Sequence, residues 1–167
     1  MTSADLLVDA FGRIREIVHR AVGGLTPEQL AHRVNGEANS IAWLVWHLTR
    51  IQDDHIAEAA AVPQVWTAKG WDERFGLPFG PAQTGYGHSS EQVEAVRVDS
   101  WELLTGYHDA VHEQTVAYVE TLGDADLERI VDRSWDPPVT LGVRLVSVVS
   151  DDLQHAGQAG FIRGLLP

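Results

Sequence analysis

Four long segments of the chain repeat apolar side chains at the 3.6-residue period of an α-helix. Such stripes are stable in water only when they are buried against one another, so the pattern predicts an all-α protein built as a four-helix bundle. Asp99 and Glu102 have the spacing of a capping box at the start of the third segment. The expected helices span Ser3–Val22, Asn39 or Ser40 to Val62, Asp99–Leu122 and Thr140–Leu165, with a shorter helix over Ser89–Val96.

The connection between the second and third helices, residues 63–88, breaks the helical pattern with prolines, glycines and aromatic residues. Connections longer than about 12–15 residues are uncommon in compact domains and often carry function. We therefore expect an ordered, long crossover loop between helices 2 and 3 of the bundle. No segment alternates apolar and polar residues as a half-buried strand would.

Length and composition limit the class of protein. With 167 residues, 44% of them hydrophobic, the chain is long enough for one domain with a substantial core, so a single domain over residues 1–167 is expected. No stretch approaches the ~18 apolar residues of a membrane span. The opening segment MTSADLLVDAFGRIREIV lacks the basic start and apolar run of a signal peptide, which favours a cytoplasmic location.

Charge and cysteine content exclude several partners and chemistries. A formal net charge of −12 speaks against nucleic acid or an anionic membrane as the partner, because both attract clustered Lys and Arg. The chain has no cysteine, which excludes disulfides, zinc sites with cysteine ligands and a thiol nucleophile of the protein itself. Any thiol used in the chemistry has to come from outside the chain.

The last expected helix carries a pair of residues that can bind a metal. Asp151 and His155 are four residues apart, so they lie one turn apart on the same helix face. A third ligand from another helix would complete a site with an open coordination position, which is typical of catalytic metals. The same spacing also occurs in ordinary ion pairs on helix surfaces.

His47 is the natural third ligand, although the residues alone leave other histidines open. It lies in WLVWHLTR, within a helix that is apolar nearly all round, and a buried imidazole needs a partner for each ring nitrogen. A hydrogen-bonded core histidine meets this need as well as a metal ligand does. His55 lies nearer the centre of the same apolar stripe, and His108 and His112 form a second pair spaced by four residues.

Three stretches resemble a known group of proteins: NSIAWLVWHLTRIQDDHI, WDERFGLPFGPAQTGYGHSSEQVEAVR and VRLVSVVSDDLQHAGQAGFIRGLL. They are similar to the DinB-like superfamily, in its actinobacterial branch related to mycothiol-dependent transferases and the mycothiol-dependent maleylpyruvate isomerase. The resemblance extends from Ser40 to Leu166. It implies an up-down-down-up four-helix bundle, in agreement with the helical pattern.

The resemblance also implies a metal site. Members commonly hold a divalent metal through a histidine of the second helix and an H-x-x-x-H or E-x-x-x-H pair of the last helix. Asp151 departs from this pattern, because its side chain is one methylene shorter than the more usual Glu. The ligands implied for this chain are His47, Asp151 and His155, with Gln158 and Arg163 in supporting positions of the family's H-x-G-Q…R tail.

The expected cofactors are a divalent metal, with zinc preferred and nickel, iron or manganese able to use the same ligands, and mycothiol as co-substrate. A metal with an open position can hold a thiol as thiolate. The resemblance implies that this thiol is mycothiol, which is then conjugated to a small electrophile or used to isomerise it. Asp54 is expected to orient the thiol. The aromatic loop is expected to form the substrate pocket through Trp71, Phe79, Tyr86 and His88.

Two other functions remain open from the sequence. A metal-dependent hydrolase would use the open position to activate water instead of a thiol. A non-catalytic, stress-related or ligand-binding bundle would keep the three residues as a relic or as a structural metal site. A monomer and a homodimer are both compatible with the apolar faces.

Overall fold

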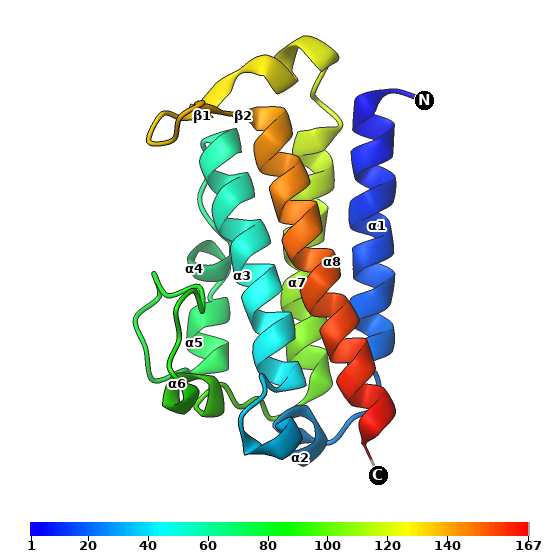
Figure 1. Ribbon diagram of the computed structural model, residues 1–167, viewed down its shortest axis with the longest axis vertical. Coiled ribbons are helices and arrows are strands. Elements are labelled where there is room, and N and C mark those ends of the chain that lie inside the picture. Colours follow the sequence, from blue (N-terminus) through cyan, green and yellow to red (C-terminus); the bar gives the residue numbers. More distant parts are fainter. Residues whose placement is uncertain (167) are drawn as a thin grey trace.

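A computed structural model describes residues 1–166 of the chain. It confirms the all-α class and the bundle: four long helices, α1 (Ser3–Val22), α3 (Ile41–Ala60), α7 (Trp101–Val119) and α8 (Leu141–Leu165), run side by side (Figure 1). α8 packs between α1 and α3, and α7 closes the bundle behind them. α1 and α8 run in one direction and α3 and α7 in the other, so the topology is up-down-down-up. No helix among residues 1–166 is long and apolar enough to cross a membrane.

The helix starts follow the predicted capping residues at two of the long helices, α3 and α8. Ser40 and Thr140 each accept a hydrogen bond from a backbone N–H in the first turn of α3 and α8, as expected of N-caps. The capping box predicted at Asp99 is wrong. α7 begins two residues later, and its N-cap is Ser100, whose extended backbone leaves Asp99 outside the helix.

The connections between the long helices contain several short elements. They are α2 (Pro27–Leu30), η1 (Val34–Gly36), α4 (Val65–Ala68), α5 (Trp71–Phe75), α6 (Ser90–Glu94), η2 (Asp124–Glu128), and the antiparallel pair β1 (Ile130–Asp132) and β2 (Val139–Thr140). The β1–β2 hairpin lies at the end of the bundle where α8 begins (Figure 1). It was not predicted, because three and two residues are too few for an alternating pattern to show.

Two buried charged residues of α3 hold the crossover loop against the bundle. Asp53 accepts hydrogen bonds from the backbone N–H groups of Val65 and Trp66, at 2.8 and 2.7 Å, and from the Tyr107 hydroxyl at 2.8 Å. Arg50 donates to the carbonyl of Gln83 at 3.2 Å. Burial raises the pKa of Asp53, against the opposing effect of these hydrogen bonds and of the Arg50 charge. The loop is therefore ordered, as expected, and fixed to α3.

We expect Asp53→Ala to destabilise the protein by about 3–5 kcal/mol, because it leaves the Arg50 cation buried without its carboxylate partner. Asp53 and Arg50 are both fully buried, with 3.7 Å between their charged atoms. Urea unfolding followed by circular dichroism measures the change. The matched control is Asp9→Ala, which removes a carboxylate from an exposed pair with Arg13 and should leave the midpoint nearly unchanged. Equal midpoints for the two variants would contradict this account of the loop.

Candidate metal centre

The structure brings His47 of α3 together with Asp151 and His155 of α8. One ligand atom from each of the three side chains lies within 4.8 Å of the others, and no second group of this kind occurs among residues 1–166. α3 and α8 are antiparallel neighbours (Figure 1), and the cluster joins one turn of α3 to one turn of α8. Asp152, the neighbouring carboxylate in the sequence, points instead into the core, where it is fully buried.

Both imidazoles are fixed so that the same nitrogen faces the centre. His47 Nδ1 lies 2.6 Å from the carbonyl oxygen of Thr84, and His155 Nδ1 lies 2.9 Å from Oε1 of Gln158. A carbonyl oxygen can only accept, so each Nδ1 carries a proton, and Nε2 is the nitrogen that can bind a cation when the ring is neutral. Histidines that bind metals in proteins are usually held in this way by an oxygen on the far ring nitrogen.

The third residue presents an oxygen without a partner. Oδ1 of Asp151 lies 3.5 Å from Nε2 of His155, whereas Oδ2 is buried with no hydrogen-bond partner among the described residues. Buried polar atoms are nearly always satisfied, so an orphaned carboxylate oxygen beside two free imidazole nitrogens fits a cation. The donors, two nitrogens and a carboxylate, fit zinc and its neighbours in the first transition series.

The titration of the three residues follows from this arrangement. The hydrogen bond with Asp151 raises the pKa of His155, although burial opposes it. Burial lowers the pKa of His47. For Asp151, burial raises the pKa, but the hydrogen bond with His155 and the charges of both histidines outweigh it and lower the pKa. A proton on His155 therefore competes with a cation, and cation affinity should fall as the pH drops through the raised pKa of His155.

A tryptophan and a glycine complete the surroundings of His47. The Trp43 ring stacks on the His47 ring, with 4.5 Å between centroids, and meets His155 edge-on at 6.2 Å. On the other side, the loop passes so close that a Cβ on Gly85 would lie 2.7 Å from Nδ1 of His47. Gly85 also has φ +94°, a conformation that favours glycine. The approach of Thr84 to His47 therefore requires glycine at position 85.

The residues predicted to support the centre separate into two groups. Gln158 lies at the centre and holds His155. Asp54 lies about two turns from His47 along α3 and accepts a hydrogen bond from Gln64 of the crossover loop at 2.7 Å. The contacts of Arg163 lie elsewhere: it donates to the carbonyls of Ala21 and Gly23, at 3.1 and 2.9 Å, and joins the end of α8 to the end of α1. The position of Arg163 in the sequence could not predict these contacts, because its partners lie at the end of α1, far away in the sequence.

The four predicted pocket residues also take different places. His88 accepts a hydrogen bond from the Trp43 indole at 3.2 Å, and Phe79 packs on His88 with 5.0 Å between ring centroids. Tyr86 is 88% exposed and lines a surface groove beside the centre. The ring of Trp71 packs against Gly106 and Tyr107 of α7, so the structure does not bring it to the histidines.

The rival histidines have other partners. His55, which the centre of the apolar stripe favoured, is half-buried and lies 2.7 Å from the Arg144 guanidinium. His108 is fully buried and bonded to the Thr49 hydroxyl at 3.1 Å, and burial lowers its pKa to about 3. Thr84, Trp43 and Gly85 were not predicted as parts of the site. Gly85, the first glycine of TGYG, indicated that the backbone approaches another group closely. The sequence did not indicate that this group is His47.

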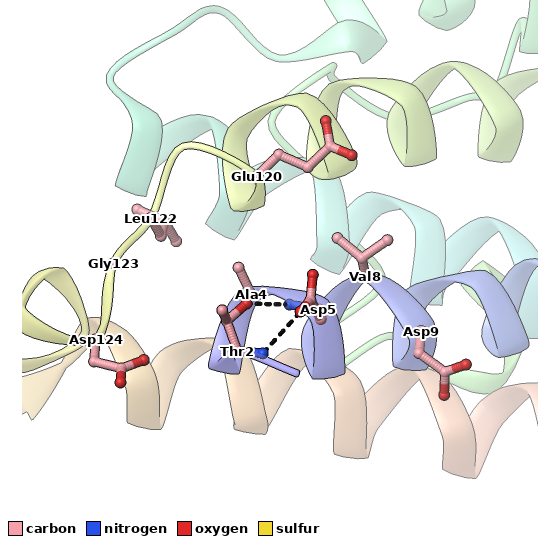
Figure 2. A pocket seen from close by; sticks show the side chains of 9 residues that line it. All are labelled: Thr2, Ala4, Asp5, Val8, Asp9, Glu120, Leu122, Gly123 and Asp124. Atoms are coloured by element: carbon pink, nitrogen blue, oxygen red, sulfur yellow. Dashed lines mark hydrogen bonds between the residues drawn. The ribbon is translucent and has the colours of Figure 1, made fainter.

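A separate hollow lies far from these residues. Figure 2 shows it between the start of α1 and the end of α7, with a volume of about 680 Å³. Two of its four carboxylates have local roles, since Asp5 closes the capping box of α1 with Thr2 and Asp9 pairs with Arg13. Neither a histidine nor a basic side chain lines it, and we assign no chemistry to it.

Comparisons with known proteins agree with the fold and with the resemblance. The family described as Mycothiol-S-transferase matches residues 6–167. A solved structure described as a conserved protein from Enterococcus faecalis is 28% identical, with a TM-score of 0.91, and the match covers 98% of this chain and 96% of that one. No curated protein matches the chain.

We expect Gly85→Ala to weaken zinc binding by about 10–100-fold, the range typical of losing an outer partner of a metal-bound histidine. The added methyl group must push Thr84 away from His47. The matched control is Gly87→Ala, because Gly87 also has a positive φ, +72°, but nothing lies within 4 Å of its added Cβ. Isothermal titration with zinc compares the two. An equal loss of affinity in both variants would show that backbone strain alone, rather than the contact with His47, was responsible.

Proposed function

The chain belongs to the mycothiol S-transferase family, and from that premise we propose that it joins the sulfur of mycothiol to a small electrophile. The observation that carries the proposal is the convergence of two free imidazole nitrogens and an orphaned carboxylate oxygen. The absence of cysteine fits as well, because the reacting sulfur must then belong to a co-substrate.

His47, Asp151 and His155 would hold the divalent metal, for which we propose zinc. When bound, such a metal lowers the pKa of a thiol that coordinates it, so that the sulfur reacts as thiolate at neutral pH. Three protein ligands are the number found at catalytic zinc sites, which keep one position for substrate. Structural sites are closed by a fourth protein ligand, and none belongs to this cluster.

The chain's own residues orient and shield the reacting groups. Thr84 and Gln158 keep both imidazoles in the tautomer that frees Nε2. Trp43 covers one face of His47 and restricts the access of water. The reaction forms a bond between sulfur and carbon and breaks the bond between that carbon and its leaving group. The leaving group departs with the electron pair, and the thiol proton passes to solvent.

A cytoplasmic location, an actinobacterial source and the choice between monomer and homodimer remain predictions. So does the alternative in which the thiol isomerises its partner and leaves again, because the same centre would activate the sulfur for both outcomes. The two reactions differ in their products, which mass spectrometry distinguishes.

We expect the purified protein to contain one equivalent of a divalent metal and to conjugate mycothiol to members of a panel of electrophiles. His155→Ala should lower the conjugation rate by at least about 100-fold. Losing a hydrogen-bond partner of a metal ligand costs up to about 100-fold, and this variant removes the ligand itself. His32→Ala, at an exposed loop position, is the matched control and should keep full activity. Elemental analysis and mass spectrometry measure the two quantities, and circular dichroism verifies the helical content.

Three results would contradict the proposal. They are a protein that neither contains nor takes up metal, a His155→Ala variant with wild-type activity, and turnover of the electrophile that needs no added thiol. The last result would indicate hydrolysis by the same centre.

A further inference from the structure

Two surface grooves lie on either side of the candidate metal centre. Thr84, whose carbonyl holds His47, and Ser147, one turn before Asp151, line the first groove, of about 540 Å³. Gln158, which holds His155, and Leu44, one turn before His47, line the second, of about 550 Å³. Along α3 and α8, the three ligands therefore lie between the residues that line the two grooves. Volumes of 300–1,000 Å³ are typical of small-molecule sites.

The first groove contains charged side chains, which the second lacks, and we call it the polar groove. Two carboxylates, Asp54 and Asp132, and one guanidinium, Arg144, line it. Arg144 pairs with Asp132 at 3.0 Å and contacts His55 at 2.7 Å, so these two opposite charges offset each other and Asp54 is the remaining carboxylate. Burial and the neighbouring Arg144 lower the pKa of His55, which keeps that ring neutral at pH 7. Carboxylates thus outnumber cations here, which disfavours an anionic ligand.

Two large aromatic rings stand exposed at the edge of the polar groove. Tyr86, from the crossover loop, is 88% exposed, and Trp135, from the β1–β2 hairpin, is 67% exposed. The flat apolar face of such a ring can stack on the C–H face of a sugar-like ring, and nearby carboxylates accept hydrogen bonds from its hydroxyl groups. The chemistry of the polar groove therefore fits a neutral, polyhydroxylated molecule.

The second groove is apolar and uncharged. Its lining consists of aliphatic and aromatic side chains with only two amides, and Phe161 is 69% exposed at its edge. Such a lining has no group that would recognise a polyol, but it suits a hydrophobic small molecule. The residues of this apolar groove are Val34, Ala38, Asn39, Leu44, Gly157, Gln158, Phe161 and Ile162.

We infer that the two grooves divide the substrates of the reaction: the polar groove holds the polyhydroxylated sugar portion of the thiol, and the apolar groove holds the electrophile. The inference rests on the proposed function for the identity of the thiol. It assigns a binding role to the β1–β2 hairpin through Trp135. It also gives a reason why thiols that carry carboxylates, such as glutathione, would bind more weakly than a neutral one.

The test compares two exposed aromatic residues, one in each groove. Isothermal titration with S-methylmycothiol, whose sulfur is blocked, measures binding of the sugar portion without turnover. We expect Trp135→Ala to raise the Kd about three- to tenfold, as the loss of one aromatic stacking contact does, and Tyr86→Ala to act in the same direction. Phe161→Ala should leave this Kd unchanged and instead raise the KM for the electrophile.

Different outcomes separate this inference from the proposed function. An unchanged Kd in Trp135→Ala and Tyr86→Ala, or a raised Kd in Phe161→Ala alone, overturns the assignment of the grooves even if the wild type conjugates mycothiol. Failure of the wild type to bind S-methylmycothiol also overturns it. If the wild type binds the probe in the expected pattern but forms no conjugate, the grooves stand and the proposed reaction fails. S-methylglutathione, which is anionic, should bind more weakly than S-methylmycothiol.

Discussion

The hydrogen bond between Nδ1 of His47 and the carbonyl oxygen of Thr84 links the fold to the chemistry. It fixes the tautomer of His47 and turns Nε2 toward Asp151 and His155. It exists because the crossover loop lies against α3, where Arg50 binds the carbonyl of Gln83, the residue before Thr84. Gly85, the residue after Thr84, leaves the space that the imidazole needs. Three consecutive loop residues therefore set the orientation of one ligand.

The buried charges of α3 explain how an irregular loop can be this well fixed. Loop backbone must find hydrogen-bond partners wherever it is shielded from water. The Asp53 carboxylate supplies them at the start of α4, and the Arg50 guanidinium supplies them further along the loop. α3 is the most buried of the long helices. On the side that faces the loop, Asp53 and Arg50 provide the hydrogen-bonding groups that an apolar helix would lack. The hydrogen bonds that Asp53 and Arg50 form with the loop offset part of the free-energy cost of burying their charges.

The sequence predicted the bundle well because helical periodicity is a local signal. Ser40 and Thr140 marked the helix starts through their own side chains. The β1–β2 hairpin was not predicted because its strands are too short for an alternating pattern, and α7 begins later than predicted because Ser100 keeps an extended backbone. The proximity of Asp151 and His155 could also be predicted from the sequence, because residues four apart in a helix lie about one turn apart. The position of His47 depends on how α3 crosses α8, and only the family resemblance favoured it over His55, which faces Arg144 instead.

We propose that Nε2 of His47, Nε2 of His155 and the Asp151 carboxylate bind one metal ion. Anomalous diffraction at the zinc edge, from crystals of the zinc-loaded protein, tests it most directly. We expect one strong peak about 2.0–2.2 Å from all three ligand atoms, with Thr84 and Gln158 still bonded to the Nδ1 atoms of the two histidines. A peak beside His108 and His112, a peak bound through Nδ1 of either ligand, or no peak at all would contradict it.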